Sequence, residues 1–228
     1  MFQISRWSSH CPPTFFQTTM YLPRSATVPS FSLITKVPTS EAKCDAAVGG
    51  EVAPIEAPRR EELEAFEDLR SRIAGMGDTA LADRLERLRE AREIWVAPRL
   101  GPERWAVFVE ALSLVKRIYL RREALLDPVA HLYRTPRPDI PRAYQEAHAW
   151  LGLAGALRHE LAHRDGVREE ADAYDAELAW YETVRQAAPL TRMRDEERRA
   201  WEWGLDAAVL SARKARETAS GSSGAPSP

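Results

Sequence analysis

The sequence predicts a mainly α-helical fold in which a helix with a His-Glu-x-x-His motif packs antiparallel to the helix that follows it. A small edge strand or hairpin can accompany these helices. Three observations lead to this prediction. Apolar residues recur at helical spacing through most of the stretch from residue 55 to residue 218. Proline and glycine separate the periodic segments. Hydrophobic residues make up 44% of the chain and charged residues 29%, as in a soluble globular protein.

Composition divides the 228 residues into three parts. Residues 1–54 are rich in Pro, Ser and Thr and lack steady periodicity, so we predict that they are disordered. Their composition also fits an over-extended start upstream of the true initiation site. Residues 55–218 form the predicted helical domain. The tail 219–228 is rich in Ser, Gly and Pro and is predicted to be disordered.

Two helices are predicted at the start of this domain. The first covers residues 57–75 and ends at the glycines that follow. Asp78 is a candidate N-cap for the second helix, which we expect to run from Thr79 to about Trp95. The apolar positions that support the two helices are Leu63, Phe66, Leu69, Ile73, Leu81, Leu85, Leu88 and Ile94.

The most apolar segment begins at Pro102 and continues to about Tyr119. Its spacing fits a period of 3.6 better than a period of 2, which favours a third helix, although residues 112–120 are also compatible with a strand. The proline-rich connection 126–141, which contains His131, is interpreted as a lid, a cleft wall or a surface crossover.

Three further segments complete the domain. Pro141 precedes a predicted helix at residues 142–164, and Asp165-Gly166 is a turn signal. A helix from about residue 167 or 168 to Gln186 follows, and a last helix is expected from about Arg192 to Glu217. Because the turn is tight, the two helices around it must run antiparallel.

The helix 142–164 carries the sequence His159-Glu160-Leu161-Ala162-His163. Residues four apart lie on one face of a helix, so His159 and His163 can point two imidazoles at one metal ion. Glu160 lies about 100° further round the helix, from where it can reach a water molecule on that metal. This pattern predicts a zinc site (Zn2+) with Glu160 as the general base.

A zinc site needs a third protein ligand, and the next helix is expected to supply it. Residues equally far from the turn face each other, which brings residues 169–172 level with the two histidines. We select Glu170, with Glu169 as the alternative, because Glu170 borders the apolar stripe of its helix. This stripe consists of Ala171, Tyr174, Leu178 and Tyr181. Glu177, two turns beyond Glu170, is expected to hydrogen-bond a ligand histidine.

Together these residues resemble zincin metallopeptidases of the gluzincin kind, in which a second helix supplies a glutamate. The resemblance covers about residues 150–182 and implies a zinc-dependent hydrolase that cleaves a peptide or amide bond with a metal-activated water. In zinc peptidases an edge strand commonly runs beside the metal helix and holds the substrate backbone. The metzincin form, with Glu169 in the place of the third histidine and Met193 in a methionine turn, is a competing match.

Two alternatives to an enzyme stay open, a non-catalytic metal-binding bundle and a structural helical bundle. In a three-histidine bundle the further ligand would be His131 or His148. His148 shares the face of His159, but about 16 Å along the helix separates the two. In a zincin-type site His148 therefore cannot bind the same ion as His159. A satisfied core histidine is the simpler role for it.

Net charge and cysteine content limit which partners and which cysteine-based sites are expected. The net charge of −2 gives no reason to expect nucleic-acid or membrane binding, so the expected partner is a peptide or protein substrate. Both cysteines, Cys11 and Cys44, lie in the N-terminal segment. The predicted domain therefore has no disulfide or cysteine zinc site, which fits a cytoplasmic protein.

Overall fold

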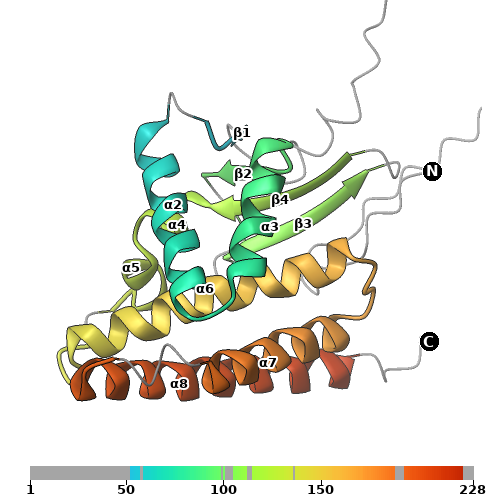
Figure 1. The fold of residues 1–228 in the computed structure, drawn as a ribbon. Coiled ribbons are helices and arrows are strands. Elements are labelled where there is room, and N and C mark those ends of the chain that lie inside the picture. Colours follow the sequence, from blue (N-terminus) through green and yellow to red (C-terminus); the bar gives the residue numbers. More distant parts are fainter. Residues whose placement is uncertain are drawn as a thin grey trace, which may run out of the picture.

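The chain folds into a mainly helical structure with one small sheet (Figure 1). This computed structural model describes residues 52–56, 59–98, 100, 105–111, 115–135, 137–187 and 193–222. The predictions made for residues 1–51 and 223–228 lie outside the described residues. None of the described helices is both long enough and apolar enough to cross a membrane.

All the described strands lie before residue 122, and every described element after them is a helix. The helices are α2 (Arg60–Gly75), α3 (Thr79–Glu90), α4 (Arg122–Leu126), α5 (Pro128–Leu132), α6 (Arg142–Arg164), α7 (Glu170–Gln186) and α8 (Asp195–Ser222). The strands are β1 (Ala53–Pro54), β2 (Ile94–Ala97), β3 (Ala106–Ala111) and β4 (Val115–Arg121).

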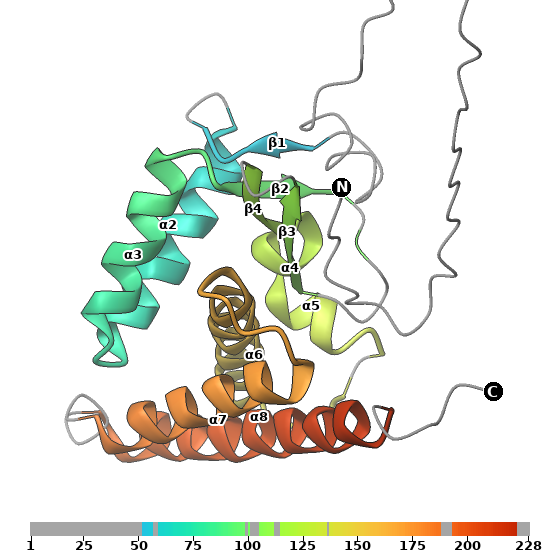
Figure 2. The same ribbon diagram turned by 90° about the vertical axis from the view of Figure 1, so that its right-hand side faces the viewer.

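The sheet has the strand order β1-β2-β4-β3. The central strands β2 and β4 are parallel, whereas β1 and β3 pair antiparallel to their neighbours. Among the described strands β3 therefore forms one edge. Figure 2 shows α6 almost end-on in the middle of the molecule, with the sheet above it, the α2–α3 pair on one side and α7 and α8 below.

The core lies around α6. Buried residues from α2, α3, the sheet and α7 form one continuous apolar cluster with this helix. Burial on that scale is the main favourable term in folding, and it leaves α6 supported on several sides. The largest fully buried residues of this core cluster include Phe66, Leu69, Ile73, Leu85, Ile94, Ile118, Leu120 and Tyr181.

The structure confirms the mainly helical fold class and several helix boundaries. Helix α6 occupies residues 142–164 as predicted. Asp78 caps α3, because its side chain accepts a hydrogen bond of 2.9 Å from the Leu81 amide. The other carboxylate oxygen of Asp78 accepts from the Trp180 indole at 3.0 Å, which ties the start of α3 to α7.

The predicted third helix is wrong. The segment that begins at Pro102 forms the β3–β4 hairpin where it is described, and Ile94 belongs to β2 rather than to the second helix. The alternative of a strand within residues 112–120 is the correct one. Strand β4 lies between two neighbours, and its residues 117–120 are all buried. Its apolar run at 118–120 is buried on both faces, and periodicity cannot separate such a run from part of a buried helix.

Smaller differences concern the ends of the predicted domain and its connection. Strand β1 falls within the segment 1–54, which was expected to be disordered, and it pairs with β2. Helix α8 continues to Ser222, past the predicted boundary at residue 218. The short helix α5 forms inside the connection 126–141, with Asp127 as its N-cap.

Candidate metal centre

Helix α6 brings the motif residues into the interior because small residues let its neighbours approach closely. Gly152 lies under the Trp105 ring, and a Cβ atom added there would be 3.4 Å from Trp105 Cζ2. Gly155 faces α7 even more closely. The motif end of α6 is therefore surrounded by protein, and His159 and His163 are only 6% and 7% exposed.

The turn after α6 sets the register between α6 and α7. Gly166 has φ +103°, a left-handed conformation that glycine adopts without steric cost. The Gly166 amide donates to the His163 carbonyl and the Val167 amide donates to the Ala162 carbonyl, both at 3.0 Å, as in a Schellman motif. The Val167 carbonyl then lies 2.9 Å from His163 Nδ1 and can accept a hydrogen bond from it.

Two arginine–carboxylate pairs hold this turn against the rest of the domain. Arg84 of α3 binds both carboxylate oxygens of Asp165, the residue that ends α6. Arg164 binds Glu93, which directly precedes β2. Arg84 uses two nitrogens on the two oxygens of Asp165, and Arg164 uses two nitrogens on one oxygen of Glu93. Two contacts in each pair restrict its orientation as well as its distance. The end of α6 is therefore tied to both α3 and β2.

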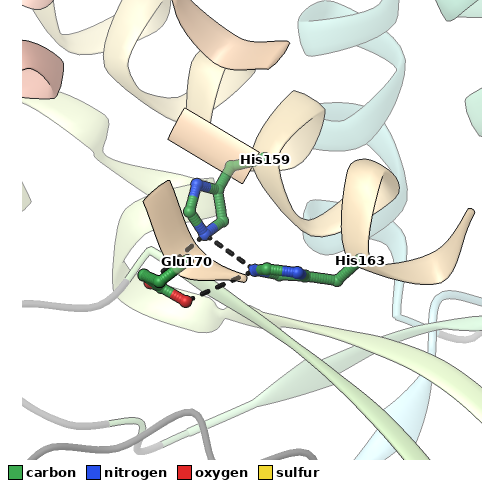
Figure 3. Close-up of side chains that lie close together, drawn as sticks. All are labelled: His159, His163 and Glu170. Carbon is green, nitrogen blue, oxygen red and sulfur yellow. Dashed lines mark hydrogen bonds and ion pairs between the residues drawn. The ribbon is translucent and has the colours of Figure 1, made fainter. Parts of the chain in front are cut away.

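Figure 3 shows that His159, His163 and Glu170 converge on one point. The two Nε2 atoms are 3.0 Å apart, His159 Nε2 is 3.3 Å from Glu170 Oε1, and His163 Nε2 is 3.4 Å from Glu170 Oε2. Zinc–nitrogen and zinc–oxygen bonds of about 2.0–2.1 Å at tetrahedral angles require ligand atoms about 3.3 Å apart. The three observed separations are close to this value, with each histidine facing a different oxygen of Glu170, so the group could hold one tetrahedral ion with a fourth position left over.

The hydrogen bonding of the two rings also fits a metal ion. If His163 donates from Nδ1 to the Val167 carbonyl, its Nε2 carries a lone pair directed at the cluster. His159 turns its own Nε2 toward the same point. With both Nε2 atoms unprotonated, two lone pairs and a carboxylate would meet at this separation, and a metal ion between them would offset their repulsion. Glu170 Oε2, which is buried without a hydrogen-bond partner, is consistent with such an ion.

The clustered side chains shift the pKa values of His159 and Glu170. Burial raises the pKa of the Glu170 carboxyl, but the two histidines beside it hold this pKa at about 2. Burial lowers the pKa of His159, and the hydrogen bond to Glu170 together with the nearby carboxylates raises it above its usual value. The anionic glutamate is therefore the form that faces the rings, as ligation requires.

Glu177 lies beside His159, where the sequence predicts a hydrogen-bond partner for a ligand histidine, but the two side chains do not form that hydrogen bond in the structure. Its Oε2 atom is 3.7 Å from His159 Nδ1, and the residue is 7% exposed. Burial raises the pKa of Glu177 to about 7, although His159 and a hydrogen bond from Tyr181 lower it. This carboxyl group faces Nδ1 of His159, the ring nitrogen that is not directed at the cluster.

Glu160 is half-buried beside this centre but is not one of the three clustered residues. Its charge raises the pKa of both His159 and Glu177, so it contributes to the electrostatics of the centre. Tyr174 packs its ring on His159, with 4.4 Å between centroids. The sequence identified Tyr174 only as part of an apolar stripe, because helical spacing does not distinguish a core tyrosine from one that flanks a ligand.

The alternative ligands lie elsewhere. Glu169 is exposed at the N-terminal end of α7, outside the cluster, and His131 packs edge-on against Trp105. His148 lies 2.7 Å from the Tyr133 hydroxyl through Nδ1 and stands edge-on to Trp203. Within the part of the chain that the structure describes, no other three His, Cys, Asp or Glu side chains meet in this way.

The packing of His148 leads to a stability prediction. Burial lowers the pKa of His148 to about 4, whereas the unfolded chain titrates near its ordinary value of about 6.5. Between these values the unfolded chain binds a proton that the folded chain does not, so stability falls as the pH drops through this window. Between pH 7 and pH 4.5 this residue should contribute a loss of about 2 kcal/mol. Denaturant unfolding at both pH values should give a smaller loss for His148→Gln, and an equal loss would contradict the assignment.

Strand β3 and helix α6 are packed together. Trp105, directly before β3, covers Gly152 in the middle of α6, and Figure 1 shows β3 extending from there in the same general direction as α6. An edge strand thus accompanies the helix that carries the two histidines. Within the part of the chain that the structure describes, no strand pairs with the outer side of β3, and such an edge is the kind that pairs with an extended chain.

Comparison with known proteins assigns no family to this chain. No family model, no curated protein and no solved structure matches it. The chemistry of the His159–His163–Glu170 group, which could hold a metal ion, is therefore the basis for any functional conclusion.

Proposed function

We propose that the protein is a zinc-dependent hydrolase that cleaves a peptide or amide bond. The observation that carries this proposal is the convergence of His159, His163 and Glu170, with 3.0 Å between the two Nε2 atoms, 3.3 Å from His159 to Oε1 and 3.4 Å from His163 to Oε2. Two imidazoles and one carboxylate are the ligand set of a catalytic zinc site that keeps one position open.

In this proposal His159, His163 and Glu170 hold the metal. Zinc, when bound, would polarise the scissile carbonyl and lower the pKa of a coordinated water. Glu160 follows His159 on the same helical turn and is half-buried. A carboxylate there takes the proton of the attacking water and passes it to the leaving nitrogen, so that one proton moves from nucleophile to leaving group.

The substrate class is proposed to be a peptide or protein in extended conformation. Strand β3 is an edge strand beside α6, and extended peptides bind such edges through main-chain hydrogen bonds. Glu170 is the most accessible member of the cluster, since its side chain is 38% exposed while both histidines are buried. A substrate carbonyl is therefore expected to approach from the Glu170 side.

Hydrolysis of a broad peptide library by the full chain tests this function. We expect cleavage with zinc present, loss of cleavage after treatment with a zinc chelator, and recovery when zinc is added back. Mass spectrometry of the products would locate the cleaved bonds. If the chain binds zinc and cuts no peptide under any of these conditions, the hydrolase proposal is wrong and a non-catalytic metal-binding role replaces it.

A further inference from the structure

A chain of buried polar groups runs from the α6 backbone through α7 to His159. Tyr181, on α7, is only 1% exposed. Its hydroxyl donates to Glu177 Oε1 at 2.9 Å and lies 3.3 Å from the Leu151 carbonyl oxygen of α6. The second oxygen of the same carboxyl group, Glu177 Oε2, faces His159 Nδ1 at 3.7 Å. One carboxyl group therefore connects the tyrosine to the histidine.

The backbone of α6 leaves space for this connection at a single position. A Cβ atom placed on Gly155 would lie 2.0 Å from the Tyr181 hydroxyl oxygen and 2.8 Å from Glu177 Oε1. Real Cβ atoms essentially never approach other heavy atoms below 3.0 Å, so any larger residue would displace both groups. Gly155 is thus matched to the two polar side chains rather than to an apolar contact.

Stability alone gives little reason to bury these groups. A carboxyl group and a phenol hydroxyl inside a core lose their hydration, and only good hydrogen bonds offset that loss. The surrounding interface is otherwise apolar, with Leu151, Leu157 and Val184 buried close by in sequence. His159 Nδ1 has no hydrogen-bond partner although it is buried, and Glu177 is the carboxyl group that faces it.

We propose that Tyr181 is a positioning residue of the metal centre, which holds Glu177 in place to accept a hydrogen bond from His159 Nδ1. This bond selects the tautomer of His159 whose Nε2 lone pair points at the metal, and it makes that nitrogen a stronger ligand. Gly155 provides the space that the arrangement needs. The inference rests on the metal centre of the proposed function, but it does not depend on hydrolysis.

The test is the zinc affinity of the full chain with Tyr181→Phe, measured by competition with a chromogenic chelator. Loss of an outer hydrogen-bonding partner typically costs roughly 10–100-fold in metal affinity, and we expect a loss in that range. Tyr119→Phe is the matched control, because Tyr119 is also fully buried but lies on β4, where Arg117 approaches its hydroxyl at 3.5 Å. The control should keep the zinc affinity of the wild type, whatever it does to the melting temperature.

A second pair of variants and a spectroscopic readout separate positioning from simple packing. Glu177→Gln keeps an oxygen that accepts from His159 Nδ1, so it should lose less zinc affinity than Glu177→Ala. Nitrogen NMR of the zinc-loaded protein should show His159 protonated at Nδ1 in the wild type and in Tyr119→Phe, with the signal altered in Tyr181→Phe.

The outcomes distinguish this inference from the proposed function. If wild type binds zinc and Tyr181→Phe binds it equally well with an unchanged His159 signal, the positioning role is wrong and the metal centre stands. If wild type binds no zinc, both are overturned. If zinc affinity falls in Tyr181→Phe while no peptide is cleaved by wild type, the positioning role stands and only hydrolysis fails.

Discussion

Replacing Glu160 by Gln should lower the rate of peptide cleavage by about 10²–10⁴-fold and leave the zinc content unchanged. The three clustered residues that could hold the metal do not include Glu160, so the metal does not need its charge for binding. Glutamine has nearly the same shape as glutamate but cannot take a proton from water at neutral pH. The loss should therefore appear in kcat and kcat/KM together, as expected for an interaction made in the transition state.

The measurement is steady-state cleavage of a peptide that the wild type cuts, together with elemental analysis of each protein. Glu169→Gln is the control, since Glu169 is an exposed glutamate close to the same turn and lies outside the cluster. It should retain both zinc and activity. Unchanged turnover in Glu160→Gln would remove the support for a general base at this position.

Much of the candidate centre follows from the sequence because local signals determine it. Proline and the Asp165-Gly166 turn mark the ends of α6, and the spacing of the two histidines places them on one face. A tight turn makes α7 run antiparallel to α6, so counting residues from the turn gives residues 169–172, and the apolar stripe of the helix then selects Glu170 among them. The same count places Glu177 near a ligand histidine, where the structure has it.

The hairpin and the Tyr181 contact could not be predicted in this way. Residues 117–120 of β4 are buried on both faces between β2 and β3, and the apolar run at 118–120 depends on neighbours that are remote in sequence. Tyr181 falls in an apolar stripe, so helical spacing assigns it to the core. Its polar contact with Glu177 requires the close approach of α7 to Gly155, which only the packed helices reveal.

Glu170→Gln should weaken zinc binding by more than the roughly 10–100-fold expected for an outer partner, because it replaces an anionic ligand that contacts both rings. Glu169→Gln should bind zinc as the wild type does. Titration of each protein against a chelator of known affinity measures both values. If Glu169→Gln loses zinc and Glu170→Gln keeps it, the metzincin-like spacing is right and the cluster is not the metal site.

Elemental analysis of the purified full-length chain tests the central claim most directly. We expect about one zinc per wild-type chain. We expect none in the double variant His159→Ala/His163→Ala, which lacks both nitrogen ligands of the cluster. A double variant that keeps its full zinc content, or a wild-type chain that takes up no zinc and melts at the same temperature with and without a chelator, would contradict the account.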